Sequence, residues 1–343
     1  MKKVAVVILN WNGEELLKKF LPSVLATLPE YAEAIIADNA STDGSIAFLN
    51  STYPEIKIIQ NKTNGGFAKG YNEALTHVHN EYVVLLNSDI ETPENWVQPM
   101  TEFMDKNPSV GAAMPKILQY RKKTHFEYAG AAGGYIDQWG FPFCRGRIFD
   151  TLEEDKGQYN NNEPVFWASG ACMFVRNDTF KKLNGFDEFF FAHMEEIDLC
   201  WRMQRAGYLV YAVGESHVYH LGGGTLNKLS PKKTFLNFRN SLFLLIKNYP
   251  RNKFLIKMTQ KLLLDGLAAA KFLFEGNVRH FLAVFKAHMS FYANLLKYLK
   301  IRKKLNQQHT NKEIIGVYKP SIAKEYFISK KNKYSDLAKD SFL

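Results

Sequence analysis

The feature that most constrains the fold of this chain is the regular alternation of short β-branched runs with amphipathic stretches over residues 4–89. Strands are expected at residues 4–10, 33–39, 56–61 and 82–89, with helices between them at residues 13–28, 41–53 and 66–78. Alternation of strand and helix at this spacing predicts a parallel sheet with helices on its faces. We therefore expect an α/β fold.

The expected strands share a second feature, because each of them ends in polar residues. These polar clusters are Asn10-Trp11-Asn12, Asp38-Asn39, the segment 61–66 and Asn87-Ser88-Asp89. The carboxyl ends of parallel strands meet at one edge of a sheet, and ligands bind beyond that edge. The clusters together therefore predict a ligand site, although an aromatic such as Trp11 is more often part of a core.

Two of the clusters have the composition of a nucleotide site. Asp38 ends its strand upstream of Ser41 or Thr42, one of which is expected to cap the next helix, so the Asp38 carboxylate can accept from a base N–H. Gly65 and Gly66 allow a close backbone approach, and the helix after them offers N–H groups to a phosphate. A glycine pair before a helix is common in loops, and it indicates a diphosphate only together with its neighbours.

Asp89 follows a buried run, residues 82–86, and has two interpretations. It is either a turn residue before Pro93 or a ligand of a hard cation such as Mg²⁺ or Mn²⁺, for which carboxylates are suited. An imidazole from His217 or His220 would complete a metal site, although a lone histidine is usually structural.

The acidic cluster in "FFFAHMEEIDLCWR" is the candidate for acid–base chemistry. Glu195, Glu196 and Asp198 follow three phenylalanines, and clustered acids near aromatics raise one another's pKa toward the range of a general base. Acidic residues are also typical of a helix N-terminus. We expect both to hold, with Asp198 as local structure and Glu195 or Glu196 as the base.

The pattern changes along the rest of the chain. Further strands are expected at residues 110–118 and 208–213, a helix at residues 195–207 and a polar loop at residues 146–164. Beyond residue 230, helices rich in aromatic residues and Lys/Arg are expected at residues 234–250, 253–276 and 278–304, and residues 302–343 are basic and weakly patterned.

The net charge of +10 is divided unevenly along the chain. Residues 1–227 hold 20 Lys/Arg and 28 Asp/Glu, whereas residues 228–343 hold 24 Lys/Arg and 6 Asp/Glu. A basic rear part indicates contact with nucleic acid or with an anionic membrane surface. No nucleic-acid motif supports the first alternative, and the absence of an apolar run of about 18 residues predicts no transmembrane helix.

The cysteines and the apolar run near the N-terminus indicate the cellular compartment. Cys144, Cys172 and Cys200 contain no CxxC pair, which argues against a disulfide framework or a zinc site and favours a reducing compartment. The run "VAVVILN" is interpreted as a buried strand rather than as the apolar region of a signal peptide.

Taken together, these motifs resemble glycosyltransferase family 2, the inverting, nucleotide-sugar-dependent enzymes with a GT-A fold. The resemblance covers about residues 3–225 and rests on "VILNWNG", "ADNASTDGS", "NGGFAKGYN", "LLNSD", "WASGACMFVRNDTFKKLNGFDEFFF", "EEIDL" and "HLGGGT" in the family's order. Within the family, the chain is similar to bacterial rhamnosyltransferase-like members that build cell-surface polysaccharide.

The resemblance implies a GT-A nucleotide-diphospho-sugar transferase fold, which is a mostly parallel central sheet flanked by helices, with a C-terminal helical extension. It implies that residues 1–227 form the GT-A domain. Residues 228–305 are then a basic amphipathic helical region that associates with a membrane or packs on the GT-A domain or a second subunit, and residues 306–343 are a basic C-terminal tail.

The resemblance also implies roles for individual residues. The nucleotide-binding side comprises Asn10, Asn12, Asp38, Asn39, Asp43, Gly65, Gly66, Gly70, Asn72, Asn87 and Ser88. The acceptor-binding side comprises Trp167, Ser169, Gly170 and Asp198. The metal ligands are Asp89, the acid of the family's DxD element, and His220, and the catalytic base lies in Glu195-Glu196.

Two departures from the family pattern bear on these roles. Asn87 stands where the DxD element has its first acid, so metal binding rests more heavily on Asp89. Glu195-Glu196 replaces the usual Glu-Asp pair, which moves the base carboxylate one methylene further out. The alignment of the motif favours Glu196 as the base and leaves Glu195 as the alternative.

The implied reaction moves a sugar from a nucleoside-diphosphate sugar to an acceptor hydroxyl, with inversion in one displacement and with Mg²⁺ or Mn²⁺ bound. The implied acceptor is a cell-surface glycan, commonly linked to a polyprenyl diphosphate. The implied location is cytoplasmic and peripheral on the inner face of the cytoplasmic membrane. The resemblance does not fix the donor sugar, the nucleotide or the linkage. It also leaves the oligomeric state open, with a homo-oligomer as one alternative.

Two functions from other classes are weighed against this one. A sugar-1-phosphate nucleotidyltransferase would carry a Gly-rich basic loop after its first strand, and "NWNGEELLKK" lacks such a loop. A nucleotide-sugar-binding scaffold would not need the acids at residues 89 and 195–198, so these acids favour an enzyme.

Overall fold

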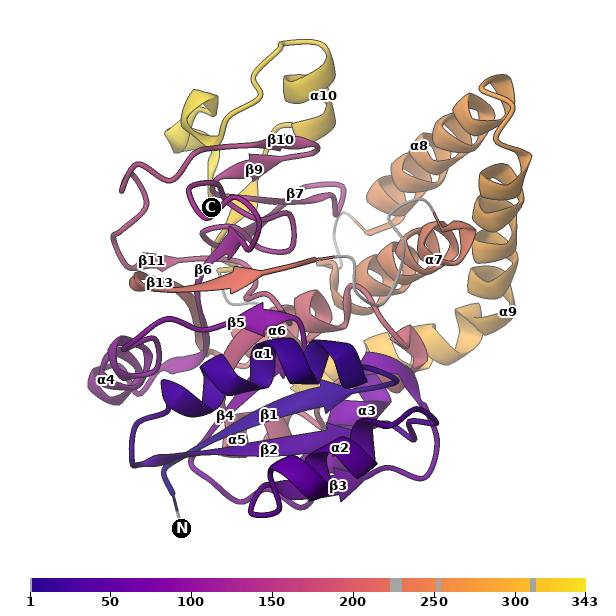
Figure 1. Cartoon of the computed structure of the whole chain (residues 1–343). Coiled ribbons are helices and arrows are strands. Elements are labelled where there is room, and N and C mark those ends of the chain that lie inside the picture. Colours follow the sequence, from indigo (N-terminus) through magenta and orange to yellow (C-terminus); the bar gives the residue numbers. More distant parts are fainter. Residues whose placement is uncertain (1, 223–229, 251–253, 309–312) are drawn as a thin grey trace.

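The computed structural model describes residues 2–222, 230–250, 254–308 and 313–343, and Figure 1 traces its elements. The strands of the main sheet are β1 (Val4–Asn10), β2 (Ala32–Asp38), β3 (Lys57–Gln60), β4 (Tyr82–Asn87), β5 (Ile90–Glu91), β6 (Val110–Gln119), β11 (Glu163–Pro164), β12 (Cys172–Arg176) and β13 (Leu209–His220). The helices around it are α1 (Glu14–Ala26), α2 (Ser45–Thr52), α3 (Gly66–Leu75), α4 (Gln98–Lys106), α5 (Asn177–Lys182) and α6 (Glu195–Arg205), with the 3-10 helix η1 (Glu188–Phe190) before α6.

The front of the main sheet is parallel, as the alternation predicts. The strand order is β11-β13-β6-β12-β4-β1-β2-β3, and β1 pairs in parallel with β2 and β4. The register sets Asn10 opposite Asp38 and Leu9 opposite Asn87. The polar strand ends therefore lie at one edge of the sheet, which confirms their predicted grouping.

Beyond β4 the sheet is mixed. β12 runs antiparallel to both β4 and β6, whereas β6 and β13 are parallel. The pairing of β13 with β6 is irregular between Val213 and His217, and the end of β13 pairs with β5, where His220 lies opposite Ile90. This pairing brings His220 beside Asp89, which links β4 to β5.

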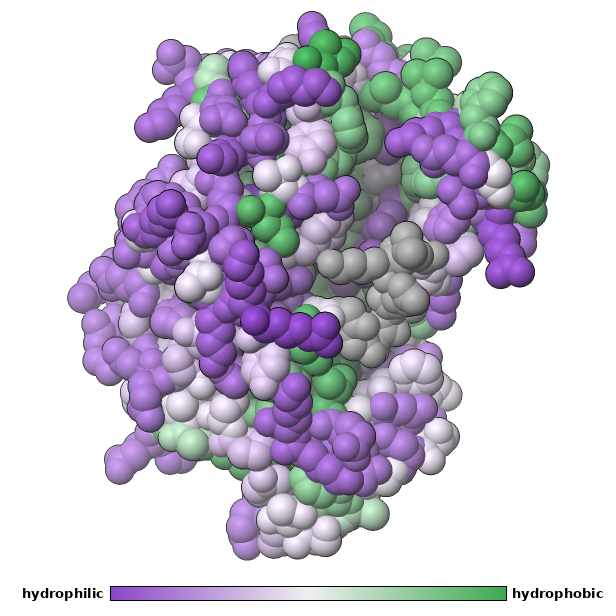
Figure 2. Space-filling model, turned by 45° about the horizontal axis from the view of Figure 1, so that its top comes forward, coloured by the Kyte–Doolittle hydropathy of each residue, from purple (hydrophilic) through white to green (hydrophobic). Residues whose placement is uncertain are grey.

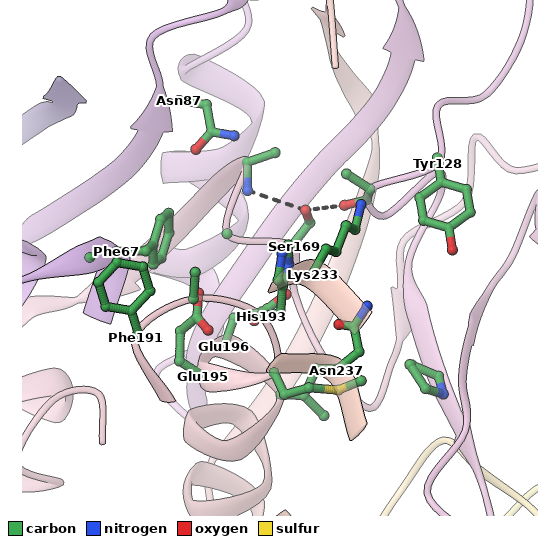
Figure 3. A pocket seen from close by; sticks show the side chains of 18 of the residues that line it. Phe67, Asn87, Tyr128, Ser169, Phe191, His193, Glu195, Glu196, Lys233 and Asn237 are labelled. Carbon is green, nitrogen blue, oxygen red and sulfur yellow. Dashed lines mark hydrogen bonds between the residues drawn. The ribbon is translucent and has the colours of Figure 1, made fainter. Parts of the chain in front are cut away.

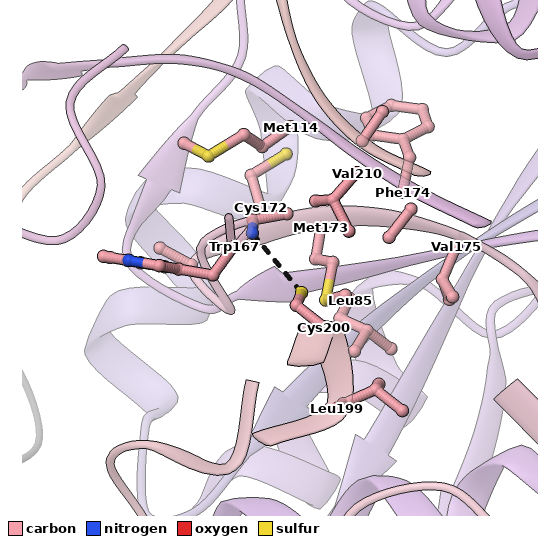
Figure 4. Packing of buried hydrophobic residues seen from close by; sticks show 14 of the residues in the cluster. Leu85, Met114, Trp167, Cys172, Met173, Phe174, Val175, Leu199, Cys200 and Val210 are labelled. Carbon is pink, nitrogen blue, oxygen red and sulfur yellow. Dashed lines mark hydrogen bonds between the residues drawn. The ribbon is translucent and has the colours of Figure 1, made fainter. Parts of the chain in front are cut away.

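The core beneath the carboxyl edge is apolar and tightly filled. Figure 4 shows Leu85, Met173 and Leu199 packed where α6 meets the sheet. The backbone N–H of Ala168 donates to Cys200 Sγ at 3.4 Å, which ties α6 to the segment before β12. All three cysteines are buried and free. Burial raises the pKa of the Cys200 thiol to about 12, so this group is inert at neutral pH.

A second, smaller sheet covers the other end of the molecule. Its strands are β7 (Gly134–Asp137), β8 (Pro142–Cys144), β9 (Arg147–Ile148), β10 (Thr151–Leu152) and β14 (Val317–Tyr318), in the order β10-β9-β8-β7-β14. The expectation of a polar loop at residues 146–164 is wrong, because this segment contributes β9, β10 and β11. These strands are two residues long, and a run of that length shows no periodicity in sequence.

The C-terminal residues join this second sheet. β14 pairs in parallel with β7, and Tyr318 and Ile322 are fully buried. The helix α10 (Ile322–Phe327) follows. Residues 313–343 are thus packed on residues that precede 227, while the predicted boundary between residues 227 and 228 and part of the "HLGGGT" motif lie outside the described residues.

The three helices expected after residue 230 are confirmed. They are α7 (Pro231–Asn248), α8 (Phe254–Phe274) and α9 (Val278–Gln308), which pack against one another beside the two sheets in Figure 1. Over the described parts of the chain, none of the helices combines the length and the apolar character needed to cross a membrane.

The predicted cap of α2 is wrong in its residue. The helix begins at Ser45, and Asp43 Oδ1 accepts from the backbone N and from Oγ of Ser45 at 3.1 and 2.6 Å. Ser41 Oγ instead accepts from the backbone N of Asn12 at 2.9 Å. Ser41 therefore fixes the turn after β1 rather than the start of α2.

Candidate active site

A cavity of about 620 Å³ lies at the carboxyl edge of the main sheet, with α7 and α8 contributing to its wall. Pockets of roughly 300–1,000 Å³ are typical of small-molecule sites. The predicted site residues that line this cavity are Asn12, Asn39, Gly66, Asn87, Ser88, Asp89, Trp167, Ser169, Gly170, Glu195, Glu196 and His220. The structure thus gathers residues from a span of more than two hundred positions.

Two predicted nucleotide residues lie behind the cavity wall. Asn10 and Asp38 are buried and do not line the cavity, and Asn10 Nδ2 donates to Asp38 Oδ1 at 3.1 Å. Asp38 Oδ2 accepts from the backbone N of Ser41 at 2.9 Å. These bonds fix the loops after β1 and β2, and a direct contact between Asp38 and a nucleotide base stays a prediction.

Four more predicted residues stabilise the helices around the site. The Asn72 amide donates to the backbone O of Phe186 and accepts from its backbone N, both at 2.9 Å, which ties α3 to the segment before η1. Asp43 holds the start of α2, Gly65 precedes α3, and Gly70 lies inside α3. None of these four lines the cavity.

The glycine loop before α3 docks on the segment before α6. Gly66 has φ +80°, and a Cβ at this position would lie 2.5 Å from the backbone O of Phe191. Only glycine therefore fits. The N–H groups of Gly66 and Ala68 donate to Asn64 Oδ1 and to the backbone O of Phe191, at 2.9 and 3.2 Å. These two donors, which we expected to be free for a phosphate, are engaged within the protein.

Asp89 and His220 form the centre of a charged group on the wall. His220 Nε2 lies 3.0 Å from Asp89 Oδ1, and His220 Nδ1 lies 3.1 Å from Glu127 Oε2. Asn87 Nδ2 lies 3.4 Å from the same Nε2. Burial by itself lowers the pKa of His220, but the two carboxylates outweigh it and raise that pKa to about 10. The imidazolium therefore donates to both acids.

The donor atoms of this group fit a divalent cation. A carboxylate and an imidazole face the cavity together, and the second ring nitrogen of His220 is bonded to a carboxylate, which is the usual support of a metal-binding histidine. Within the described residues, no three His, Cys, Asp or Glu side chains converge closely enough to form a complete metal site. Asp89 and His220 would therefore share an ion with ligands from outside the protein.

Glu195 and Glu196 begin α6 at the bottom of the cavity. Figure 3 shows both carboxyl groups beside Phe191, and each has a buried Oε2 atom that finds no hydrogen-bond partner in the part of the chain that the structure describes. Burial raises the pKa of Glu196 to about 7, and burial together with the Glu196 charge raises the pKa of Glu195 well above its usual range. A carboxylate with a pKa near 7 is suited to proton abstraction at neutral pH.

The segment that leads into these acids has an unusual backbone. Phe191, His193 and Met194 have φ values of 64°, 70° and 74°. Each non-glycine residue in this left-handed region costs roughly 1–3 kcal/mol, and such conformations persist only where the surroundings impose them. We refer to residues 189–194 as the base loop.

Two side chains of α7 hold the base loop in this conformation. Asn240 Nδ2 donates to the backbone O atoms of Phe190, Ala192 and His193 at 2.9, 3.0 and 2.7 Å. Arg239 donates to the backbone O of Phe190 at 3.0 Å and to the side chain of Asn240 at 2.9 Å. The geometry of the acids thus depends on a helix from the C-terminal half of the chain.

His193 is a further polar residue of the cavity wall. It is part of the strained base loop and lines the cavity beside the acids, and no described residue forms a hydrogen bond with its Nε2. Burial lowers the pKa of His193 to about 4, and the charge of Lys233 acts in the same direction. His193 is therefore neutral at physiological pH and can donate or accept toward a bound hydroxyl.

Asp198 does not belong to the cavity, contrary to its predicted acceptor role. It is fully buried, and its carboxylate accepts from Lys247, Arg202 and Asn248, each at 2.8 Å. Although burial would raise the pKa of Asp198, Lys247 and Arg202 lower it to about 2. The other prediction, Asp198 as local structure, describes these contacts.

Replacing Asp198 with alanine is expected to lower the free energy of unfolding by roughly 3–5 kcal/mol, because two buried cations would lose the carboxylate between them. Among the described residues, Lys247 would keep only its ion pair with Asp187, and Arg202 only its hydrogen bonds to backbone carbonyls. Urea denaturation followed by circular dichroism measures this loss. The matched control is Asp178→Ala, which removes an exposed pair with Lys182 and should change stability by less than about 1 kcal/mol. Equal effects of the two substitutions would contradict a structural role for Asp198.

Several residues in or around the cavity were given no role in the site from the sequence. Trp11 is 44% exposed at the cavity wall rather than part of a core. Glu127 and His193 carried no spacing that pointed to the site. Arg239 and Asn240 bind backbone carbonyls, and this leaves no mark on sequence periodicity. No sequence signal sets them apart from the other polar residues of α7, such as Asn237, Ser241 and Lys247.

The chain is similar in sequence to a known family and to curated relatives. The family described as Glycosyl transferase family 2 matches residues 5–183. A curated relative, the N-acetylglucosaminyl-diphospho-decaprenol L-rhamnosyltransferase of Mycobacterium tuberculosis, is 26% identical over 233 residues, covering 63% of this chain and 75% of the relative.

Solved structures share the fold. The crystal structure of GalNAc-T7 with UDP, GalNAc and Mn²⁺ matches with a TM-score of 0.56 and 16% identity, covering 72% of this chain and 48% of that chain, so this chain spans about half of it. The mannosyltransferase PcManGT from Pyrobaculum calidifontis in complex with GDP-Man and Mn²⁺ matches with a TM-score of 0.52 and 14% identity, covering 88% of this chain and 84% of that chain. These likenesses confirm the fold expected from the sequence.

Proposed function

The chain belongs to glycosyltransferase family 2, and from this premise we propose that it is an inverting, metal-dependent hexosyltransferase. The family and its relatives establish glycosyl transfer to a glycan or lipid-linked acceptor. The observation that carries the finer proposal is that one cavity contains both a carboxylate–imidazole pair for a cation and a pair of acids with raised pKa. A binding scaffold would need the first pair and not the second.

We assign the donor to the end of the cavity near the strand ends. Asn12, Asn39 and Gly66 line this end, and the indole of Trp11 offers an exposed face on which a base or sugar can stack. Asn10 and Asp38 support this wall from behind. GDP-Man in the structure of the Pyrobaculum protein and UDP in that of GalNAc-T7 support a nucleoside-diphosphate sugar here, without selecting the nucleotide.

Asp89 and His220 would hold Mg²⁺ or Mn²⁺ beside the donor diphosphate. A cation there would supply the positive charge that stabilises a leaving diphosphate. The Mn²⁺ in both solved structures supports a divalent ion. Asn87, which stands where the family has an acid, adds an amide to this wall and no negative charge.

Glu196 is the proposed base, with Glu195 as the alternative. Its carboxylate accepts the proton of the acceptor hydroxyl while the hydroxyl oxygen attacks the anomeric carbon. Attack comes from the face opposite the leaving diphosphate, so the configuration inverts and no covalent enzyme intermediate forms. His193, neutral and beside Glu196, can orient the same hydroxyl.

A screen of donors tests the proposed function. Purified protein is incubated with UDP-, GDP- and dTDP-sugars, with Mn²⁺, Mg²⁺ or EDTA, and nucleoside diphosphate release is measured together with thermal shift. We expect one class of donor to stabilise the protein and to be hydrolysed or transferred only with metal. Binding of a donor without any turnover, with every acceptor offered, would favour the scaffold instead.

We also propose that the enzyme works on an anionic membrane surface. Along α9, apolar residues recur at alternating intervals of four and three positions, and each is 38–74% exposed: Val278, Leu282, Phe285, Met289, Tyr292, Leu296 and Leu299. Figure 2 shows apolar side chains gathered over α8 and α9. This apolar stripe has the form of an interfacial helix face.

The charges around the stripe favour lipid over a second copy of the chain. Residues 254–308 carry ten Lys/Arg and two Asp/Glu. Two such surfaces would repel each other, whereas anionic headgroups attract them. We keep the division into a GT-A domain at residues 1–227, a membrane-associating helical region at residues 228–305 and a basic tail at residues 306–343 as a proposal.

Substituting Leu296 with aspartate in the full chain is expected to weaken sedimentation with phosphatidylglycerol-containing vesicles by about tenfold, because it removes apolar contact and adds a negative charge. Ile328→Asp, an equally exposed position on the second sheet's side of the molecule, is the control and should sediment like the wild type. If both variants bind vesicles as the wild type does, the stripe is not the membrane face.

A further inference from the structure

The cavity has a second arm, whose wall contains none of the residues predicted from the sequence. It is formed by α7, α8 and the segment from Tyr128 to Phe149. Figure 3 shows Lys233, Asn237 and Tyr128 on one side of Glu195 and Glu196, with the aromatic rings of the donor side on the other. We call this part the α7–α8 arm, and its lining residues are Tyr128, Phe141, Arg147, Lys232, Lys233, Asn237, Phe238, Lys261, Leu264, Asp265 and Ala268.

The arm next to the acids is basic. Lys232 and Lys233 extend from α7 in two directions, since Lys232 Nζ lies 4.8 Å from the ring centre of Phe191 and Lys233 Nζ lies 5.9 Å from that of Tyr128. Arg147 adds a third positive charge from β9. A concave wall with cations from separate elements is suited to an anionic ligand.

Arg147 gives an independent indication of a ligand. It is almost fully buried and stacks on Tyr128 at 4.4 Å, and among the described residues its Nε has no hydrogen-bond partner. One of its terminal nitrogens donates only to Cys144 Sγ, a weak acceptor, at 3.3 Å. A buried guanidinium with an unpaired donor is unfavourable, and a phosphate oxygen is the acceptor that best matches its geometry.

The far end of the arm is apolar and leads to the surface. Leu264 and Ala268 of α8 line the cavity, as does Phe141. Leu264 is also partly exposed, and its neighbours on α8, Leu263 and Leu267, are 66% and 68% exposed. Lys261 is neutralised by Asp265 at 2.7 Å, so it adds no net charge to this end. An apolar path thus runs from the cavity onto the outer face of α8.

We propose that the α7–α8 arm binds the diphosphate and the first isoprenoid units of a lipid-linked acceptor. This inference rests on the proposed function, because it assigns the acceptor of the same site. The order of acidic, basic and apolar groups along the cavity wall matches the order of sugar, diphosphate and lipid along such a molecule. The sugar hydroxyl meets Glu196, the diphosphate meets Lys232, Lys233 and Arg147, and the lipid follows α8 to the membrane.

Calorimetric titration of the full chain in EDTA, with farnesyl diphosphate, inorganic pyrophosphate and farnesol as probes, tests the arm. Farnesyl diphosphate should bind more tightly than either part alone. The double variant Lys232→Ala/Lys233→Ala should weaken farnesyl diphosphate and pyrophosphate by roughly 10- to 100-fold and leave farnesol unchanged. Leu264→Glu should weaken farnesyl diphosphate and farnesol and leave pyrophosphate unchanged.

Lys271→Ala is the control, since Lys271 lies on α8, the other helix of the arm, is exposed and does not line the cavity. It should bind all three probes as the wild type does. The inference is overturned if pyrophosphate binds as tightly as farnesyl diphosphate, or if the double variant binds like the wild type.

A competition experiment separates this inference from the proposed function. Farnesyl diphosphate and the donor nucleotide should bind to the protein at the same time. If each excludes the other, the probe lies at the donor end of the cavity, and the ligand proposed for the α7–α8 arm is wrong. If farnesyl diphosphate binds as expected but no nucleotide sugar is turned over, the proposed function fails while the arm's ligand chemistry stands.

Discussion

Replacing Glu196 with glutamine is expected to lower kcat by at least about 10²-fold, with little change in the affinity for the donor. Glutamine has the same size and the same position at the start of α6, but it cannot accept the proton of the acceptor hydroxyl. Single-turnover kinetics with a saturating donor and acceptor measures the chemical step. Thermal denaturation of the same sample shows that the variant is folded.

Glu195→Gln is the matched control, because both acids begin the same helix and line the same cavity. Turnover of the wild-type rate by Glu196→Gln, with a large loss in Glu195→Gln, would move the base to Glu195. The wild-type enzyme also has a distinctive pH dependence. Since burial raises the pKa of Glu196 to about 7, its base form is lost as the pH falls below 7. The value of kcat should therefore drop about tenfold per pH unit there, and should level off above 8.

Replacing Asp89 with alanine is expected to lower kcat/KM by at least about 10²-fold and to abolish the dependence of donor binding on Mn²⁺. Asp89 is the acid in contact with His220, and Asn87 cannot take its place because an amide carries no charge. Titration of the donor at increasing Mn²⁺ concentrations, followed by calorimetry, reports the metal-dependent part of the affinity directly.

The control for Asp89 is Glu91→Ala. Glu91 lies two residues further along, faces away from the cavity and pairs with Lys123, so its loss should leave the response to Mn²⁺ intact. A donor affinity that rises with Mn²⁺ equally in Asp89→Ala and the wild type would show that Asp89 is not a metal ligand. Activity that is unaffected by EDTA in the wild type would remove the metal from the proposal altogether.

The sequence predicted the parts of the fold that depend on local periodicity. β1 to β4 and α7 to α9 are long enough for their apolar residues to show a period, and the alignment of Asn10, Asp38 and Asn87 follows once the strands are parallel. The position of Asp89 follows from the end of β4. The position of His220 required the pairing of β13 with β5, which joins residues more than a hundred positions apart.

Long-range pairing was the part that could not be predicted. The second sheet pairs Ile136 with Val317, and its strands are too short for any pattern. The status of Asp198 was also open, since an acid in the first turn of a helix can face either a ligand or a buried cation. Only the packing of α7 against α6, which places Lys247 beside it, decides between the two.

The contacts of Arg239 and Asn240 with the base loop have a consequence for how the enzyme is made and how it evolves. A nascent chain that has emerged only as far as α6 contains every acid of the proposed site, yet lacks the side chains that hold the base loop. Catalytic competence should therefore arise late in synthesis, after α7 docks. Recombination between relatives should likewise need a crossover outside residues 189–248, because a junction within this segment separates the base loop from the helix that holds it.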